Sequence, residues 1–377
     1  MVSTAYLDHA ATTPIRPAAI EAIHTILDAP AGNPSGAHRA AQRARRRLDE
    51  SRDAVAALAG RSPSEVYFTS GGTEADDLAV AGYAGRGVVV CPATEHHAVL
   101  DPVLRAGGRV VPVDRTGAVR LDALADALDG DVALVSVMAA NNETGRVADL
   151  AAVAAVVRDR APGAALHTDA VQAAGWLDLG ELAADADLVS VTGHKLGGPM
   201  GSGALLVRRD REPAARIIGG GQERDLRSGT PNLPGAVGFG AGAAEVVATR
   251  SATAATVAAL RDRLEDAILD ELDGVETTVA RADRLPGICH LVIDGVEAES
   301  VIVLLDEAGV SASAASSCAS GATRASHVLT AMGADLAARS TLRLSLGWCS
   351  TAADVDRVLD ALPPIVKRLR EHRRRAA

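Results

Sequence analysis

Short runs of β-branched and other apolar residues alternate with longer stretches rich in Ala, Leu and Arg along most of the chain. The short runs have the composition of buried strands, and the longer stretches are typical of helices that cover a sheet. This alternation predicts an α/β fold with a mostly parallel sheet. We expect strands over residues 66–69, 87–91, 109–113, 133–138, 165–168, 188–192 and 204–207. We expect helices over residues 16–27, 37–59, 73–81, 149–160 and 234–272.

The last third of the chain has a different pattern. It predicts strands over residues 287–293, 310–312 and 341–346, and helices over residues 298–308 and 352–370. We therefore predict a large domain over residues 16–250. A smaller α/β domain would combine residues 1–15 with residues 251–377.

Composition and charge narrow the class of protein. The 377 residues are 48% hydrophobic, so the chain can build a sizeable core. A net charge of −10 argues against nucleic-acid binding through a basic surface. No apolar run reaches the roughly 18 residues of a membrane span, and the N-terminus lacks the layout of a signal peptide. We therefore expect a soluble cytoplasmic protein.

Two residue types are sparse enough to draw attention. The 38 basic residues include only two lysines, Lys195 and Lys367. A GC-rich genome explains this bias, but a retained lysine is also a candidate for amine chemistry, which a guanidinium cannot perform. The four cysteines have no C-x-x-C spacing, so we expect no metal site.

Residues 66–74 (VYFTSGGTE) predict a strand, a Gly-rich turn and the start of a helix. Free backbone N–H groups at such a helix start, with the hydroxyl of Thr73, form an anion site suited to phosphate. Two further polar residues follow apolar strands. Asp169 ends one, where a buried carboxylate needs either an arginine or a protonated ring nitrogen as its partner. Lys195 follows another, in a turn where its amine could form a Schiff base.

Together, these residues form the set that pyridoxal phosphate requires: an amine, a carboxylate for the ring nitrogen and a phosphate cradle. The chain also resembles the cysteine desulfurases. They belong to the class V aminotransferase group of fold-type I pyridoxal-phosphate enzymes, and the resemblance is to their longer-loop, NifS- and IscS-like members. It covers residues 6 to 350 and implies a large sheet domain with a smaller α/β C-terminal domain. Its motifs are residues 6–14 (YLDHAATTP), 32–35 (GNPS), 69–74 (TSGGTE), 94–96 (TEH), 141–145 (NNETG), 169–172 (DAVQ), 193–195 (GHK), 219–223 (GGGQE) and 227–230 (RSGT).

The resemblance implies a role for each matching residue. His96 would stack on the cofactor ring and move protons, while Asn142 and Gln172 would hydrogen-bond near the ring hydroxyl. Arg343 would clamp the substrate carboxylate, with Asn33 and Asn142 nearby; an ordinary structural ion pair is the alternative for Arg343. The phosphate would be bound by Gly72, Thr73, Thr192 and His194, and by Thr230 from the partner subunit of a homodimer.

Cys318 distinguishes a desulfurase from other members of the superfamily, which share the lysine and the aspartate. It lies in a Ser/Ala/Gly stretch, residues 311–322, unlike a core cysteine among Val and Leu. The resemblance implies that its thiolate takes sulfur from L-cysteine, leaves alanine and passes the sulfur to a scaffold or carrier protein. The stretch lacks a glycine that the family usually has, which leaves the acceptor open.

Two alternatives remain at this point. The first is another pyridoxal-phosphate enzyme, such as an aminotransferase, an epimerase or a selenocysteine lyase, with Cys318 incidental. The second is a scaffold that keeps the fold without catalysis. The presence of Lys195, Asp169, Cys318 and Arg343 argues against the second. We expect no metal, no membrane partner and no direct contact with nucleic acid.

Overall fold

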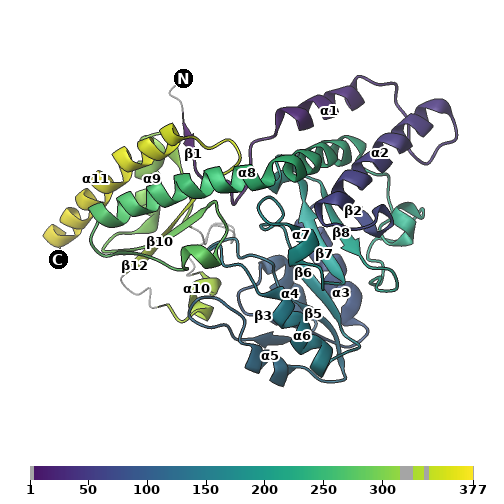
Figure 1. Cartoon of the computed structure of the whole chain (residues 1–377), viewed down its shortest axis with the longest axis horizontal. Helices are drawn as coiled ribbons and strands as arrows, with labels where there is room; N and C mark the ends of the chain where they lie inside the picture. Colours follow the sequence, from purple (N-terminus) through teal and green to yellow (C-terminus); the bar gives the residue numbers. More distant parts are fainter. Residues whose placement is uncertain (1–3, 315–325, 335–338, 377) are drawn as a thin grey trace.

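A seven-stranded sheet forms the centre of the larger of two regions of the protein (Figure 1). This computed structural model describes residues 4–314, 326–334 and 339–376. The strand order is β2-β8-β7-β6-β5-β3-β4, and β8 alone runs antiparallel to its neighbours. The strands are β2 (Val66–Thr69), β3 (Val88–Pro92), β4 (Arg109–Val111), β5 (Val132–Ser136), β6 (Ala165–Asp169), β7 (Leu188–Thr192) and β8 (Gly203–Val207).

Helices cover both faces of this sheet. Alternate strand residues enter two different cores: Val189 packs toward α2, α6 and α8, whereas Leu188 packs toward α3 and α4. A strand that is buried on both faces reads as a continuous apolar run, which is why the sequence located these strands. The helices are α1 (Pro17–Leu27), α2 (Arg39–Leu58), α3 (Gly72–Ala84), α4 (His97–Arg105), α5 (Leu121–Ala127), α6 (Leu150–Arg160), α7 (Leu179–Leu182) and α8 (Leu233–Glu271). Single 3-10 turns are η1 (Pro63–Glu65), η2 (Gly193–Lys195), η3 (Gln222–Asp225) and η4 (Arg281–Asp283).

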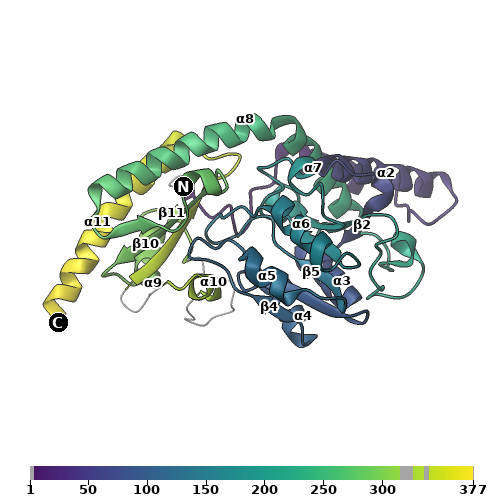
Figure 2. The ribbon, with the colours of Figure 1, turned by 60° about the horizontal axis from the view of Figure 1, so that its bottom comes forward.

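A smaller α/β region lies at the other end of α8 (Figure 2). It contains an antiparallel sheet of order β12-β10-β9 and a parallel pair, β1 with β11. The α/β class and the smaller C-terminal α/β region confirm the predicted fold class. The elements are β1 (Ala5–Tyr6), β9 (Val275–Thr277), β10 (Ile288–Asp294), β11 (Val310–Ser311), β12 (Arg339–Ser345), α9 (Ala298–Glu307), α10 (His327–Ala331) and α11 (Ala352–Ala376).

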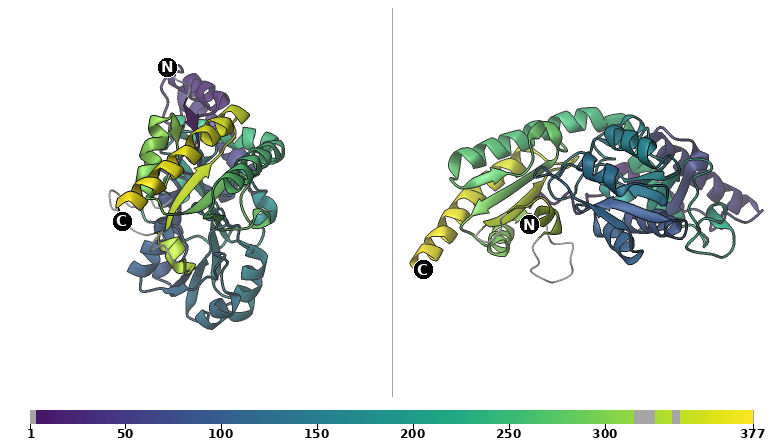
Figure 3. Two further views of the ribbon diagram at one scale, coloured as in Figure 1. Left: turned by 90° about the vertical axis from the view of Figure 1, so that its left-hand side faces the viewer. Right: turned by 90° about the horizontal axis from the view of Figure 1, so that it is seen from below.

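Helix α8 spans the two regions, as the right-hand view in Figure 3 shows. Its first half, up to Val246, packs in the core of the large sheet, and its second half, from Val257, packs in the core of the small region. The predicted domain boundary at residue 250 falls between these two positions. It stays a prediction, because one continuous helix carries both cores. None of the helices in the described part of the chain has the length and apolar character of a membrane-spanning segment.

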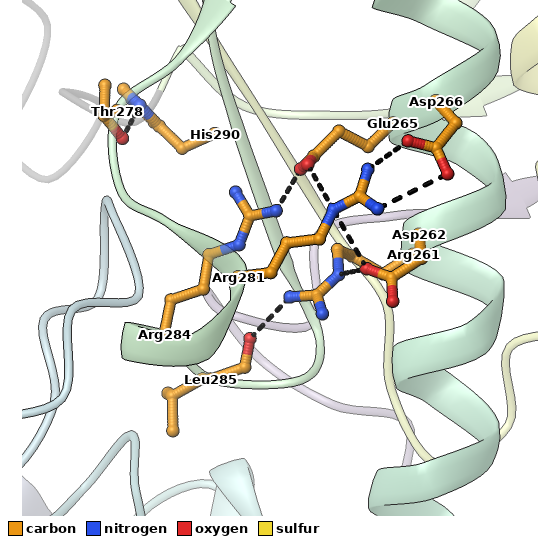
Figure 4. Close-up of polar contacts among 9 residues, drawn as sticks. All are labelled: Arg261, Asp262, Glu265, Asp266, Thr278, Arg281, Arg284, Leu285 and His290. Carbon is orange, nitrogen blue, oxygen red and sulfur yellow. Dashed lines mark hydrogen bonds and ion pairs between the residues drawn. The ribbon is translucent and has the colours of Figure 1, made fainter.

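A network of arginines and acids fixes the second half of α8 to the segment before β10 (Figure 4). Glu265 accepts hydrogen bonds from Arg284 and from Nε of Arg281, the latter at 2.7 Å. Arg281 also pairs with Asp266 at the surface. The side chain of Arg284 is fully buried, whereas that of Asp266 is 61% exposed. The network therefore has a buried end and a solvated end.

Replacing Glu265 with glutamine is expected to lower the free energy of unfolding by about 3–5 kcal/mol, because it leaves the buried Arg284 charge uncompensated. Urea unfolding followed by circular dichroism measures the change. Asp266→Asn is the matched control, and its effect should be small because that pair is screened by solvent. Equal losses in the two variants would contradict the distinction between the buried and solvated ends.

Candidate active site

The carboxyl ends of the parallel strands β6 and β7 open into a cavity of about 250 Å³. This is the position at which open α/β sheets bind their ligands. The N-terminal segment and strand β12 complete its wall. Ten of the residues predicted to bind cofactor or substrate line this cavity: Gly72, Thr73, His96, Asn142, Asp169, Gln172, Thr192, His194, Lys195 and Arg343.

Lys195 reaches the cavity from η2, the turn that directly follows β7. Its Nζ donates a hydrogen bond to the carbonyl oxygen of Ala10. Nε2 of Gln172 donates to the same oxygen at 2.7 Å. A half-buried amine is thus held at the cavity wall by the main chain of the N-terminal segment.

Asp169 is the last residue of β6 and is only 6% exposed. Its Oδ1 accepts a hydrogen bond from the backbone N–H of Val171 at 2.9 Å. Burial raises the pKa of the carboxyl, and the nearby His96 and Lys195 oppose that rise. Among the described residues, no arginine lies within ion-pair distance of Asp169. A cationic group in the cavity is therefore a suitable partner for it.

His96 is the N-cap of α4 and lines the cavity, near enough to Asp169 for the two side chains to interact electrostatically. Its Nδ1 accepts a hydrogen bond from the backbone N–H of Ala98 at 3.1 Å, which assigns the ring proton to Nε2. Burial lowers the pKa of the imidazole. His96 is therefore a neutral ring at neutral pH, suited to stacking and to donating a hydrogen bond from Nε2.

The start of α3 presents an anion site. Its N-cap, Gly71, supplies no side-chain hydrogen bond to the first turn of the helix. A Cβ atom at Gly72 would come within 2.8 Å of Val171, so the close approach of the two segments requires glycine. Thr73 is exposed to the cavity. Helix N–H groups without a side-chain cap, together with a hydroxyl, favour phosphate.

Thr192 and His194 continue this wall. The hydroxyl of Thr192 donates to the carbonyl oxygen of Ser202 at 2.9 Å, and its oxygen can also accept a hydrogen bond. Nδ1 of His194 lies 3.2 Å from Oγ1 of Thr12. Burial lowers the pKa of His194 to about 4, so its ring is neutral and offers hydrogen bonds rather than charge.

Arg343 comes from β12 in the small region and is only 3% exposed. Its Nη1 donates to the carbonyl oxygen of Asn142 at 2.9 Å, and its Nη2 donates to Oδ1 of Asp8 at 2.8 Å. Among the residues that the structure describes, none accepts a hydrogen bond from its Nε. The predicted alternative, an ion pair, is therefore present, while the described residues leave one N–H donor of this cavity-lining guanidinium unused.

Comparison with known proteins places this geometry in a family. The profile of Aminotransferase class-V matches residues 5–358. An IscS-like cysteine desulfurase of Mycobacterium tuberculosis is 45% identical, over 97% of this chain and 97% of that protein. A cysteine desulfurase of Cereibacter sphaeroides is 42% identical, over 97% and 96%. The solved structure of a NifS-like protein from Rickettsia africae superposes with a TM-score of 0.88 at 30% identity, over 97% of this chain and 99% of that one.

The chain belongs to the class-V aminotransferase family. This confirms the family that its motifs predicted. The class-V match includes both the N-terminal segment around Ala10 and the strand that carries Arg343, so it covers the whole wall of the cavity.

Three of the predicted site residues are not among the described residues that line the cavity. Asn33 is exposed, and its Oδ1 accepts a hydrogen bond from the backbone N–H of Ser35. Thr230 is exposed and lines a separate cavity beside Arg227. Cys318 lies outside the described residues. The roles of these three residues stay predictions.

Other residues in or beside this cavity were not predicted from the sequence. Asp76 lines it from α3 and is only 1% exposed, and Asp8 contacts Arg343. Asp8 belongs to the opening motif, but a carboxylate in a motif does not name its partner. Ala10 contributes a carbonyl oxygen, and a main-chain contact leaves no side-chain signal in the sequence.

Proposed function

We propose that this chain is a cysteine desulfurase that uses pyridoxal phosphate, converts L-cysteine to L-alanine and leaves a persulfide on Cys318. The single observation that carries this proposal is one cavity in which Lys195, Asp169 and His96 meet both the start of α3 and Arg343. Class-V relatives that are named cysteine desulfurases, 45% and 42% identical over nearly their whole length, support the choice of reaction.

The residues present fit pyridoxal phosphate. Asp169 offers a buried carboxylate to the ring nitrogen, and the uncapped start of α3 offers N–H groups to the phosphate. Lys195 would hold the aldehyde carbon, His96 would cover the ring, and Asn142 and Gln172 would contact its hydroxyl. When bound, this cofactor supplies a carbonyl carbon that condenses with amines and a ring that accepts electron density.

The chain's own groups then bind and orient the substrate. Arg343 would bind the carboxylate of L-cysteine, since a guanidinium fork matches the two oxygens of a carboxylate. The Nζ of Lys195 would take the proton from Cα, because this amine lies in the same cavity as Arg343. His96 would move a proton through Nε2.

The sulfur step balances without an external oxidant. The Cβ–Sγ bond of L-cysteine breaks, and a new S–S bond joins Sγ to the Cys318 sulfur. The Cys318 thiol loses its proton, and Cβ of the product alanine gains one. The two sulfur atoms are therefore oxidised while Cβ is reduced. A thiol can store sulfur in this form, whereas a hydroxyl cannot.

We further propose a homodimer in which Thr230 of one subunit completes the phosphate site of the other. The exposure of Thr230, away from the cavity of its own subunit, supports this arrangement. The persulfide would pass to a sulfur-accepting scaffold or carrier protein.

Purified protein with its cofactor should form alanine and reducible sulfur from L-cysteine in equal amounts when a reducing thiol is supplied. Amino-acid analysis and sulfide assay measure the two products. Transfer of the amino group from L-cysteine to a 2-oxo acid, without sulfur release, would favour the aminotransferase alternative. Release of selenium from L-selenocysteine, with no sulfur released from L-cysteine, would favour a selenocysteine lyase.

Replacing Asp169 with asparagine is expected to slow alanine formation roughly 10²–10³-fold, because the cofactor ring loses the charge that keeps its nitrogen protonated. Steady-state rates, divided by the cofactor content from absorbance, measure the effect. Unchanged turnover at full cofactor occupancy would contradict the role of Asp169.

A further inference from the structure

The N-terminal segment over residues 8–12 supplies partners to two groups that the proposed reaction needs. The carbonyl oxygen of Ala10 accepts a hydrogen bond from Lys195. Two residues earlier, the carboxylate of Asp8 accepts a hydrogen bond from Nη2 of Arg343 at 2.8 Å. The segment thus touches the amine from the large sheet and the guanidinium from the small one.

Asp8 is held in place by its own main chain. Its backbone forms a parallel bridge with Ser345, two residues after Arg343 on the same strand. Its carbonyl oxygen accepts a hydrogen bond from the hydroxyl of Tyr6 at 3.2 Å. The side chain is still 24% exposed, compared with 3% for Arg343. The carboxylate is therefore fixed beside a buried charge while remaining within reach of solvent.

Among the described residues, the other titratable side chains near Arg343 form no ion pair with it. His290 is its partner in register on β10, but burial lowers the pKa of His290 to about 3, so the ring is neutral. Glu143 is 5% exposed, accepts a hydrogen bond from Ser326 at 2.6 Å, and has a pKa raised by burial. Among the described residues, Asp8 is the carboxylate in contact with this guanidinium.

We propose that Asp8 is a resident counter-ion that competes with an incoming carboxylate for Arg343 and so sets the affinity of the site for amino acids. This role rests on the proposed function, which makes Arg343 the partner of the L-cysteine carboxylate. In the resting protein, Asp8 compensates a buried charge that would otherwise be costly. When substrate enters, two carboxylates face one guanidinium, and their repulsion weakens binding.

A purely structural role for Asp8 predicts the opposite outcome. If the carboxylate only oriented Arg343, its removal would misplace the guanidinium and weaken carboxylate binding. The sign of the change in affinity therefore separates the two roles.

The test uses Asp8→Asn, which removes the charge but keeps the size and one accepting oxygen. The probe is propionate, a carboxylate without an amine, which binds Arg343 without reacting with the cofactor. Calorimetry on the full-length protein, purified with its cofactor, should show the propionate Kd falling about tenfold, which corresponds to about 1.4 kcal/mol. KM for L-cysteine should fall more than kcat does, since the carboxylate is bound alike in the ground and transition states.

Glu245→Gln is the matched control. Glu245 pairs with the buried Arg16 at 2.5 Å, with 30% and 6% of the two side chains exposed, and it does not line the cavity. Its replacement should leave propionate affinity unchanged. Asp8→Ser, which removes the charge with a smaller side chain, should shift affinity in the same direction as Asp8→Asn.

Unchanged or weaker propionate binding in a folded Asp8 variant would overturn the counter-ion role. Propionate could bind more tightly to the Asp8 variants while the wild-type protein forms no alanine from L-cysteine. That result would contradict the proposed function and leave the role of Asp8 intact. Normal alanine formation by the wild-type protein, with propionate binding unchanged in the Asp8 variants, would support the proposed function and contradict the role of Asp8.

Discussion

Replacing Lys195 with alanine is expected to slow alanine formation from L-cysteine roughly 10³-fold or more, because the change removes both the amine that holds the cofactor and the base for the Cα proton. Lys195 lies in the turn after β7 and lines the same cavity as Asp169 and Arg343. Single-turnover assays with cofactor present at saturation measure the loss.

Two matched variants show whether the amine or its charge is responsible. Lys195→Arg keeps a positive charge but cannot condense with an aldehyde, so it should be as inactive as Lys195→Ala. Lys367, the other lysine, pairs with Glu271 at the surface, and Lys367→Ala should retain full activity. Substantial turnover in Lys195→Arg would mean that charge alone suffices, contrary to the assigned role.

Replacing Cys318 with serine is expected to lower sulfur release from L-cysteine roughly 10³-fold or more, because a hydroxyl cannot take up sulfur as a persulfide. The remaining cysteines are poor substitutes. Cys91 and Cys289 are fully buried, and burial raises the pKa of the Cys289 thiol to about 12. Burial also raises the pKa of Cys349, although that residue is exposed enough to react.

The Cys318→Ser protein should still bind its cofactor and propionate, since none of the described residues that line the cavity is a cysteine. Cys349→Ser is the control, and we expect full sulfur release from it. Loss of activity in Cys349→Ser, with activity retained in Cys318→Ser, would move the sulfur-accepting role to the other thiol.

Much of the cavity could be predicted from the sequence because its main groups end apolar strands. Strand β7 was predicted over the residues that form it, and β6 to within one residue. Since the carboxyl ends of parallel strands meet at one edge of a sheet, Asp169 and Lys195 were expected to converge. Their convergence in one cavity is a consequence of this topology.

The elements and contacts that were not predicted from the sequence were missed for physical reasons. Strand β1 has two residues, too few for a periodic signal, yet its pairing with β11 brings the N-terminal segment across the cavity. Helix α4 was not predicted, because it is short and contains Pro102. The contact between Asp8 and Arg343 joins residues 335 positions apart, and only the fold can bring them together.

The central claim is that L-cysteine, bound through Arg343 in this cavity, gives its sulfur to the thiol at position 318. Mass spectrometry of the peptide that contains Cys318 tests it most directly, in protein with full cofactor absorbance that has been exposed briefly to L-cysteine and then alkylated. We predict one added sulfur atom on Cys318, absent from Lys195→Ala protein treated in the same way. Alanine formed by the wild-type protein with no sulfur on that peptide, or sulfur on Cys349 instead, would contradict the claim.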